Sequence, residues 1–117
     1  MKRLATILSV LSLALVSLQA HAAGSVGDAG AGKAIAEQVC VSCHGLDGNS
    51  QTPQFPRIGG QYATYLVKSI NDYKTGQRNN PIMNGIVASM SQEDIENVSA
   101  YYAQQKGDLH VKQVPNF

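Results

Sequence analysis

The sequence predicts an all-α domain in which three main helices are joined by two long loops. Apolar residues recur every three or four positions in three stretches of the chain, which is the period of an amphipathic helix. No run of alternating polar and apolar residues is long enough for a β-strand. The segments between these stretches, residues 45–60 and 77–90, are rich in Gly, Pro, Asn and Gln, a composition typical of loops.

The first helix is expected over residues 28–40. Asp28 is a suitable N-cap, because its carboxylate accepts hydrogen bonds from the first free backbone N–H groups of a helix. At a spacing of four residues, one face carries an apolar stripe of Ala31, Ile35 and Val39. Gly32 and Ala36 lie beside this stripe as small residues.

The second and third helices have clearer ends. The second follows Gly59 and Gly60, stops at Gly76, and presents an apolar face formed by Tyr62, Leu66, Ile70 and Tyr73. The third begins after Ser91 as N-cap and has two acidic residues in its first turn, where the helix dipole favours negative charge. Its apolar face consists of Ile95, Val98 and Tyr102, and Gly107 lies just past its end.

The N-terminus has the features of a cleaved secretory signal. A basic start at Lys2 and Arg3 precedes an apolar run of 15 residues, Leu4–Leu18, and small residues at positions 20 and 22 suit a signal peptidase. A membrane span needs roughly 20 apolar residues, so this run is short for one. We therefore expect residues 1–22 to be removed and residues 23–117 to form a single domain. This domain would lie in the periplasm without stable membrane insertion, and loose association with the membrane stays open.

The composition limits the function. Once Lys2 and Arg3 are removed, seven basic and eight acidic residues remain, with no basic stripe to contact phosphates, so nucleic-acid binding is not expected. Lys68, Lys74, Arg57 and Arg78 would form a local basic patch at most. The chain has no Trp and only two Phe, so its side chains form a small hydrophobic core for three helices and two long loops. A prosthetic group would fill the space that remains between the helices.

Both cysteines of the chain lie in the stretch CVSCH, residues 40–44. A disulfide between Cys40 and Cys43 would close a very short loop and add little stability. A structural zinc site would need four ligands, and only His44 and the distant His110 are available to complete it. A redox-active dithiol needs a βαβ context, which the absence of strands denies.

Cys-x-x-Cys-His is instead the attachment site of c-type haem. Thiols at positions i and i+3 project from the same side of a helical turn, so Cys40 and Cys43 would both reach one edge of a porphyrin. His44, directly after them, would be the proximal ligand of the iron. We therefore expect one haem c, covalently attached through the two cysteines.

The sixth iron ligand decides the function, since a methionine there favours an electron carrier and an open position favours ligand binding or peroxidase chemistry. The candidates are Met83, Met90 and His110. Met90 directly precedes the Ser91 cap and has a role available as a hydrophobic staple against Ile95. Met83 lies in the expected loop NNPIMNG without such a role, so it is the preferred ligand.

At this point the chain resembles the small soluble class I c-type cytochromes, from about residue 29 to residue 106. The stretches FPRIGGQYATYLVKSINDYKTGQR and MSQEDIENVSAYYAQQ are similar to the bacterial subgroup whose dihaem members contain two such domains in tandem. The resemblance implies the class I cytochrome c fold, with three main helices and loops wrapped around one covalently bound haem.

The resemblance also implies roles for further residues. The carbonyl of Pro56 would accept the N–H of the proximal histidine, and Ile58 would pack on the haem face. The first and last helices would cross at Gly32 and Ala36 against Val98 and Tyr101. The family commonly has an aromatic residue where Ala36 stands, so this contact would be looser or filled by Tyr101 or Tyr102. For Tyr62 and Tyr65, a hydrogen bond to a haem propionate and simple core packing both stay open.

The function implied is that of a periplasmic electron carrier, not an enzyme. It would pass single electrons between redox proteins such as a membrane cytochrome bc complex, a terminal oxidase or a periplasmic reductase. The alternative is a haem enzyme or gas-binding sensor in which Met83 is displaceable, and a haem-free dithiol protein is a third class.

Overall fold

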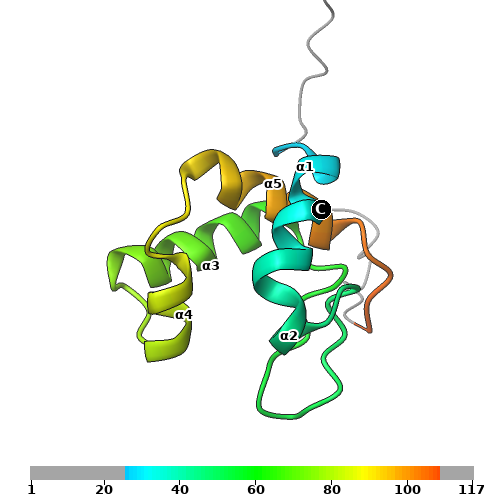
Figure 1. The fold of residues 1–117 in the computed structure, drawn as a ribbon, viewed down its shortest axis with the longest axis horizontal. Coiled ribbons are helices and arrows are strands. Elements are labelled where there is room, and N and C mark those ends of the chain that lie inside the picture. The colour runs from blue at the N-terminus through cyan, green and yellow to red at the C-terminus, as the bar shows by residue number, and fades with distance from the viewer. Residues whose placement is uncertain (1–25, 109–117) are drawn as a thin grey trace, which may run out of the picture.

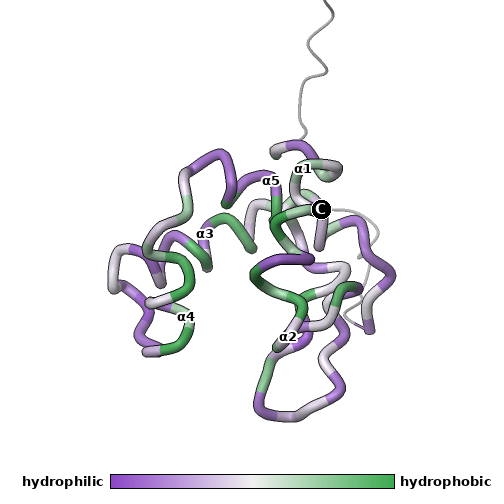
Figure 2. Tube along the Cα trace, in the orientation of Figure 1, coloured by the Kyte–Doolittle hydropathy of each residue, from purple (hydrophilic) through white to green (hydrophobic). Residues whose placement is uncertain are grey.

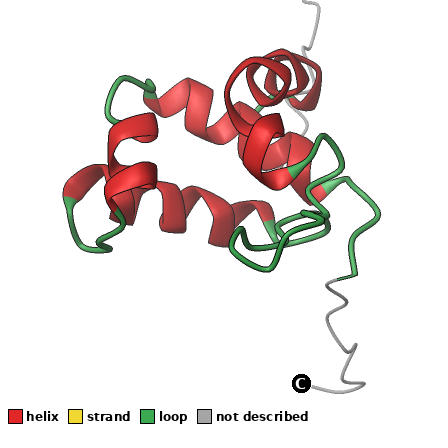
Figure 3. Cartoon of the chain, turned by 60° about the horizontal axis from the view of Figure 1, so that its bottom comes forward, coloured by secondary structure: helices red, strands yellow, loops and turns green. Residues whose placement is uncertain are grey.

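The computed structural model describes residues 26–108 (Figure 1). In chain order the elements are α1 (Ala29–Ile35), the π-helical segment η1 (Ala36–Cys40), α2 (Val41–His44), α3 (Ala63–Thr75), α4 (Pro81–Val87) and α5 (Gln92–Ala103). Within residues 26–108 there is no strand, and Figure 3 shows only helices joined by loops. The predicted all-α fold is therefore confirmed, while the signal segment and His110 lie outside the described residues.

The N-terminal helix packs across α5 through its small residues. Asp28 caps it as predicted, accepting hydrogen bonds from the N–H groups of Gly30 at 2.7 Å and Ala31 at 3.1 Å. A Cβ added to Gly32 would overlap the backbone carbonyl of Asn97 on α5, so the two backbones approach as closely as glycine permits. The helices cross at this point, as the resemblance implied, and Tyr101 contacts the same place.

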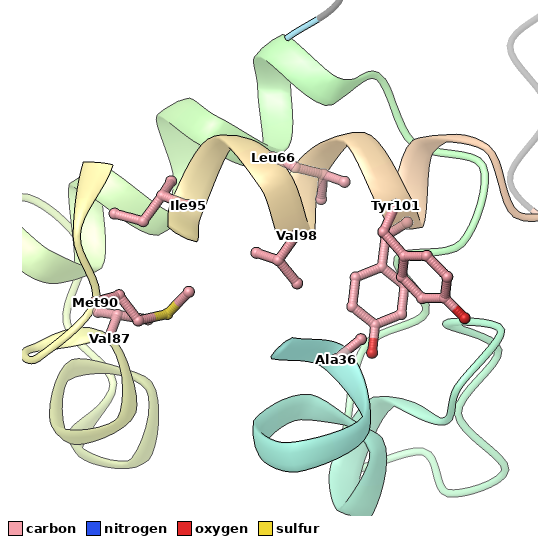
Figure 4. Packing of buried hydrophobic residues seen from close by; sticks show 8 residues of the cluster. Ala36, Leu66, Val87, Met90, Ile95, Val98 and Tyr101 are labelled. Atoms are coloured by element: carbon pink, nitrogen blue, oxygen red, sulfur yellow. The ribbon is translucent and has the colours of Figure 1, made fainter. Parts of the chain in front are cut away.

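The prediction that Ala31, Ile35 and Val39 form the buried face of this helix is partly wrong. Ala31 and Val39 are exposed, whereas Gly32 and Ala36 are buried and Ile35 is partly buried. Close packing of two backbones selects the face with the smallest side chains, and this face is not the most apolar one. Ala36 is fully buried in one cluster with Tyr101 and Tyr102, so the tyrosines fill the space left by its small side chain (Figure 4).

Helix α3 ends as the sequence predicts. Gly76 adopts the left-handed conformation, with φ of 78°, and its N–H donates to the carbonyl of Tyr73. Leu66 is buried, and Ile70 packs against the core. The prediction for Tyr62 is wrong: it precedes the first residue of α3, and its side chain is 55% exposed.

Helix α5 supplies most of the core. Ser91 and Asp94 form a reciprocal capping box, with Asp94 N–H to Ser91 Oγ at 3.0 Å and Ser91 N–H to Asp94 Oδ2 at 2.8 Å. The predicted face of Ile95, Val98 and Tyr102 is buried, which confirms that prediction. Figure 2 shows apolar stretches on these helices, whereas the connecting loops are mainly polar.

One helix was not predicted. Residues 81–87, expected within a loop, form α4, so Met83 lies on a helix. The Asn80 side chain accepts hydrogen bonds from the N–H groups of Ile82 at 3.0 Å and Met83 at 3.1 Å, and Pro81 occupies the first helical position. An Asn cap followed by Pro is a strong helix start, because Pro lacks an N–H that would need a partner there. The other expected loop, residues 45–60, contains no helix.

Candidate haem-binding site

A cavity of about 400 Å³ lies between the helices, a size typical of cofactor sites. Its wall draws on η1, α2, α3, α4, α5 and the loop before α3. All six residues predicted for the site border it, namely Cys40, Cys43, His44, Pro56, Ile58 and Met83. The fold thus brings together residues from three separate parts of the chain.

The π-helical segment η1 turns the CVSCH stretch toward this cavity. In an uninterrupted α-helix Cys40 and Cys43 would lie on the same face as Gly32 and Ala36, because residues spaced by three and four share a face. That face contacts α5. A π-helical turn contains one additional residue. Because each residue advances the chain by about 100° around the helix axis, the residues after the turn point about 100° away from where an α-helix would place them. The interruption at Ala36–Cys40 therefore lets the small residues face α5 and the thiols face the cavity.

Both cysteines are unbonded and partly buried. Burial raises the pKa of the Cys40 thiol to about 11. A thiol with a raised pKa is a poor nucleophile at neutral pH, because the thiolate is the reactive form.

His44 is fixed at the end of α2. Its side chain is buried, and Nδ1 lies 2.9 Å from the carbonyl oxygen of Pro56, so the ring N–H donates to this carbonyl. This is the hydrogen bond that the resemblance implied. It leaves Nε2 as the nitrogen with a free lone pair, and a hydrogen bond of this kind orients the ring and raises its basicity toward a metal.

The loop that carries Pro56 and Ile58 is held by backbone contacts. The carbonyl of Gly48 accepts hydrogen bonds from the N–H groups of Ile58 at 2.8 Å and Gly59 at 3.1 Å. A side chain at Gly48 would collide with the backbone of Gly59, and its φ of 73° also favours glycine.

Two tyrosines of α5 hold the turn after His44. The hydroxyl of Tyr102 donates to the Gly45 carbonyl at 3.1 Å, and that of Tyr101 donates to the Leu46 carbonyl at 2.9 Å. The sequence predicts that Tyr102 lies on an apolar face, and the helical pattern does not predict these hydroxyl contacts. A repeated Tyr on a buried helix face is the available hint, since a buried tyrosine hydroxyl usually needs a partner.

Met83 and Met90 both border the cavity, so the placement alone does not choose between them. Met83 is partly buried on α4. Met90 is buried in one cluster with Val87 and Ile95, and Figure 4 shows its side chain beside that of Val87, below Ile95. Met90 thus has a packing role in the core in addition to its place at the cavity wall, and its staple contact with Ile95 stays a prediction.

The charges on the cavity wall fit a haem. The lining is mostly apolar, as a flat macrocycle requires, and it includes Arg57 and Arg78 but no Asp or Glu. Haem c carries two carboxylates, so a wall with cations and no anions is complementary to it. Arg57 is already paired with Asp108.

The remaining residues of the expected basic patch are also engaged. Lys68 pairs with Asp72 at 2.6 Å, and Lys74 donates to the backbone carbonyl of Met90.

No helix within the described range combines the length and apolar character needed to cross a bilayer.

The fold and the site define a class I c-type cytochrome. The cytochrome c family model matches residues 29–106, and the chain belongs to this family. The family carries covalently bound haem c, which confirms the cofactor predicted from the sequence.

Individual relatives agree with this assignment. Cytochrome c4 of Pseudomonas aeruginosa is 46% identical over 97 residues, which cover 83% of this chain and 46% of that protein. Cytochrome c-554(548) of Halomonas halodenitrificans is 43% identical over 85 residues, covering 68% of this chain and 99% of that protein. The structure of Acidithiobacillus ferrooxidans cytochrome c4 superimposes with a TM-score of 0.62 at 32% identity, covering 70% of this chain and 52% of that one. The chain thus spans about half the length of the cytochrome c4 proteins that it matches.

Proposed function

We propose that this protein is a periplasmic electron carrier that holds one haem c through thioether bonds to Cys40 and Cys43. His44 and Met83 would be the protein ligands of its iron, and Pro56 and Ile58 would support the His44 side of the haem. The observation that carries the proposal is the convergence of these residues, from η1, α2, the following loop and α4, on one mostly apolar cavity.

The protein residues have separate tasks in this function. The bound haem supplies a one-electron iron couple. The Pro56 carbonyl orients the ring of His44, a buried residue at the cavity wall, and leaves Nε2 free to bind the iron. The Met83 thioether would supply a second protein ligand to the iron, and apolar residues such as Leu66 and Val87 would exclude water from the cavity. With both of these ligands supplied by the chain, little in the protein would have to move during electron transfer.

Partners are proposed by class: a membrane cytochrome bc complex, a terminal oxidase or a periplasmic reductase. The rim of the cavity includes the exposed uncharged side chains of Val39 and Ile82. Such a surface suits weak contacts of small area, under about 1,200 Å², which release a partner readily. Export directed by residues 1–22, with their removal to leave residues 23–117, belongs to the same proposal.

The competing classes make different predictions. A dithiol oxidoreductase needs a thiol of lowered pKa, and the raised pKa of Cys40 disfavours it. A gas sensor or haem enzyme needs Met83 to leave the iron readily. In the carrier, Met83 stays bound, and the reduced protein does not bind carbon monoxide at neutral pH.

The ligand assignment is tested by the near-infrared sulfur-to-iron band of the oxidised protein. We expect the band in the wild type and in Met90→Ala, and its loss in Met83→Ala. Loss in Met90→Ala with retention in Met83→Ala would assign the iron to Met90 instead. Binding of carbon monoxide by the wild-type reduced protein would favour the sensor class.

A further inference from the structure

Met83 lies on a short helix of which little is buried. Helix α4 has seven residues, and an isolated helix of this length is marginal in water. Val87 is its one buried residue, while Pro81 and Ile82 are exposed. The helix packs on α3, beside the C-terminal end of that helix (Figure 1). The position of Met83 in the cavity wall therefore depends on the contacts that fasten α4 to α3.

The side chain of Asn84, the residue directly after Met83, makes such contacts. Its Nδ2 group donates one hydrogen bond to the carbonyl of Tyr73, in the last turn of α3. It donates a second, of 3.1 Å, to the carbonyl of Arg78 in the loop between the two helices. A side-chain amide has two N–H donors, so both are used here. One side chain thus ties α4 to the end of α3 and to the loop that joins them.

The oxygen of the same amide closes the first turn of α4. Asn84 Oδ1 accepts a hydrogen bond of 2.7 Å from the backbone N–H of Asn80, and the N–H of Asn84 donates to the carbonyl of Asn80 at 2.8 Å. Asn80 Oδ1 in turn accepts from the N–H of Met83 at 3.1 Å. Met83 lies within this set of contacts, whereas Asn84 does not border the cavity. Asn84 can therefore act on the site only through the helix that carries Met83.

We propose that Asn84 is a positioning residue that holds Met83 at the haem iron and prevents an outside ligand from replacing the thioether. This inference rests on the proposed function, since it requires Met83 to bind the iron. A net hydrogen bond changes an equilibrium by roughly fivefold, so the three made by the Asn84 side chain would together disfavour opening of α4 by roughly a hundredfold. An electron carrier needs this resistance, because its iron keeps the same ligands in both oxidation states.

The test measures how tightly imidazole, an outside ligand for ferric haem, binds the oxidised protein in place of the thioether. All variants carry Met90→Leu, so that Met83 is the one methionine left among residues 26–108. Leucine has nearly the volume of methionine, and such a swap is well tolerated in a core. In this background, Asn84→Ala removes all three side-chain hydrogen bonds. Asn84→Asp keeps an acceptor for the N–H of Asn80 but loses both donors.

Asn97→Ala is the matched control. The Oδ1 of Asn97 accepts a hydrogen bond of 2.7 Å from the N–H of Asp28, where α1 meets α5, and Asn97 does not border the cavity. The control therefore removes an asparagine contact between two segments without touching α4. Every variant is first checked by mass for covalent haem, and its free energy of unfolding is measured beside its imidazole affinity.

We expect Asn84→Ala to bind imidazole about tenfold more tightly than the Met90→Leu background, to show a weaker sulfur-to-iron band and to bind carbon monoxide when reduced. Asn84→Asp should behave similarly, because the two donated bonds make the link to α3. Asn97→Ala should keep the band and the imidazole affinity of the background even where denaturant unfolds it more easily.

Two outcomes would overturn the inference and leave the proposed function intact. One is an imidazole affinity in both Asn84 variants that equals that of the background. The other is an equal rise in Asn97→Ala, which would show that lost stability alone frees the iron position. Absence of the sulfur-to-iron band in the Met90→Leu background itself would instead overturn the assignment of Met83 as ligand, and this inference with it.

Discussion

The hydroxyl of Tyr102 on α5 donates a hydrogen bond of 3.1 Å to the carbonyl oxygen of Gly45, the residue directly after His44. The C-terminal helix therefore fixes the end of the haem-attachment stretch. Removing the hydroxyl in Tyr102→Phe should lower the free energy of unfolding of the haem-loaded protein by about 1 kcal/mol, because the bond is lost at a half-buried carbonyl.

Denaturant unfolding measures this loss, and Tyr62→Phe is the control, because the Tyr62 side chain is largely exposed. Equal stability of the Tyr102 variant and the wild type would show that the hydrogen bond does not hold the turn.

Gly32 lies where α1 and α5 approach most closely. A methyl group added there would overlap the Asn97 carbonyl, so Gly32→Ala should destabilise the fold by about 3 kcal/mol. At Gly85 in α4 an added methyl group meets open space, and Gly85→Ala should instead add up to about 1 kcal/mol through helix propensity. Melting temperatures of the two variants measured side by side test this opposition of sign; a stabilised Gly32→Ala would contradict it.

The π-helical segment η1 is expected to determine whether haem attaches. Deleting the exposed residue Gln38 would restore a plain α-helix and rotate the CVSCH stretch by about 100° away from the cavity. We expect the deletion variant to lose covalent haem in a maturation-competent host, whereas Gln38→Ala, which keeps the length, retains it. Intact mass distinguishes the two, and full attachment in the deletion variant would refute the role of η1.

The capping box of α5 gives a pH dependence with a defined sign. Hydrogen bonds from the Ser91 hydroxyl and backbone lower the pKa of Asp94. A lowered pKa means that the ionised carboxylate stabilises the fold above its ordinary pKa of about 4, and that this contribution is lost as the pH falls through the lowered value. Asp94→Asn should therefore be less stable than the wild type at neutral pH and nearly equal to it at about pH 2. Urea midpoints at both pH values check this, and a constant difference would argue against it.

The sequence predicts most of the fold where local signals agree with packing. Ser91, Asp28 and Gly76 mark helix ends by backbone chemistry that needs no tertiary context, and all three do so in the structure. Helix α4 is not predicted because Pro81 and Gly85 are typical of loops, although Asn80 before Pro81 is a helix-start signal.

Other features depend on tertiary contacts that a single sequence does not contain. Val39 is exposed and Ala36 is fully buried. The orientation of this helix is set by its backbone contact with α5 and by the π-helical turn, and not by the periodicity of its apolar residues. The spacing of CVSCH indicates its chemistry directly. By contrast, the hydroxyl contact of Tyr102 with Gly45 appears only once distant segments are placed together.

The proposed function requires a haem that is covalently attached at Cys40 and Cys43 and fills the cavity between the helices. Its most direct test is the intact mass of the folded protein recovered from a host that exports it and matures c-type cytochromes. We predict the mass of the polypeptide chain plus one haem, and its reduction to the bare polypeptide mass when both cysteines are replaced by alanine. A wild-type chain that is folded and has the mass of the bare polypeptide would contradict the account.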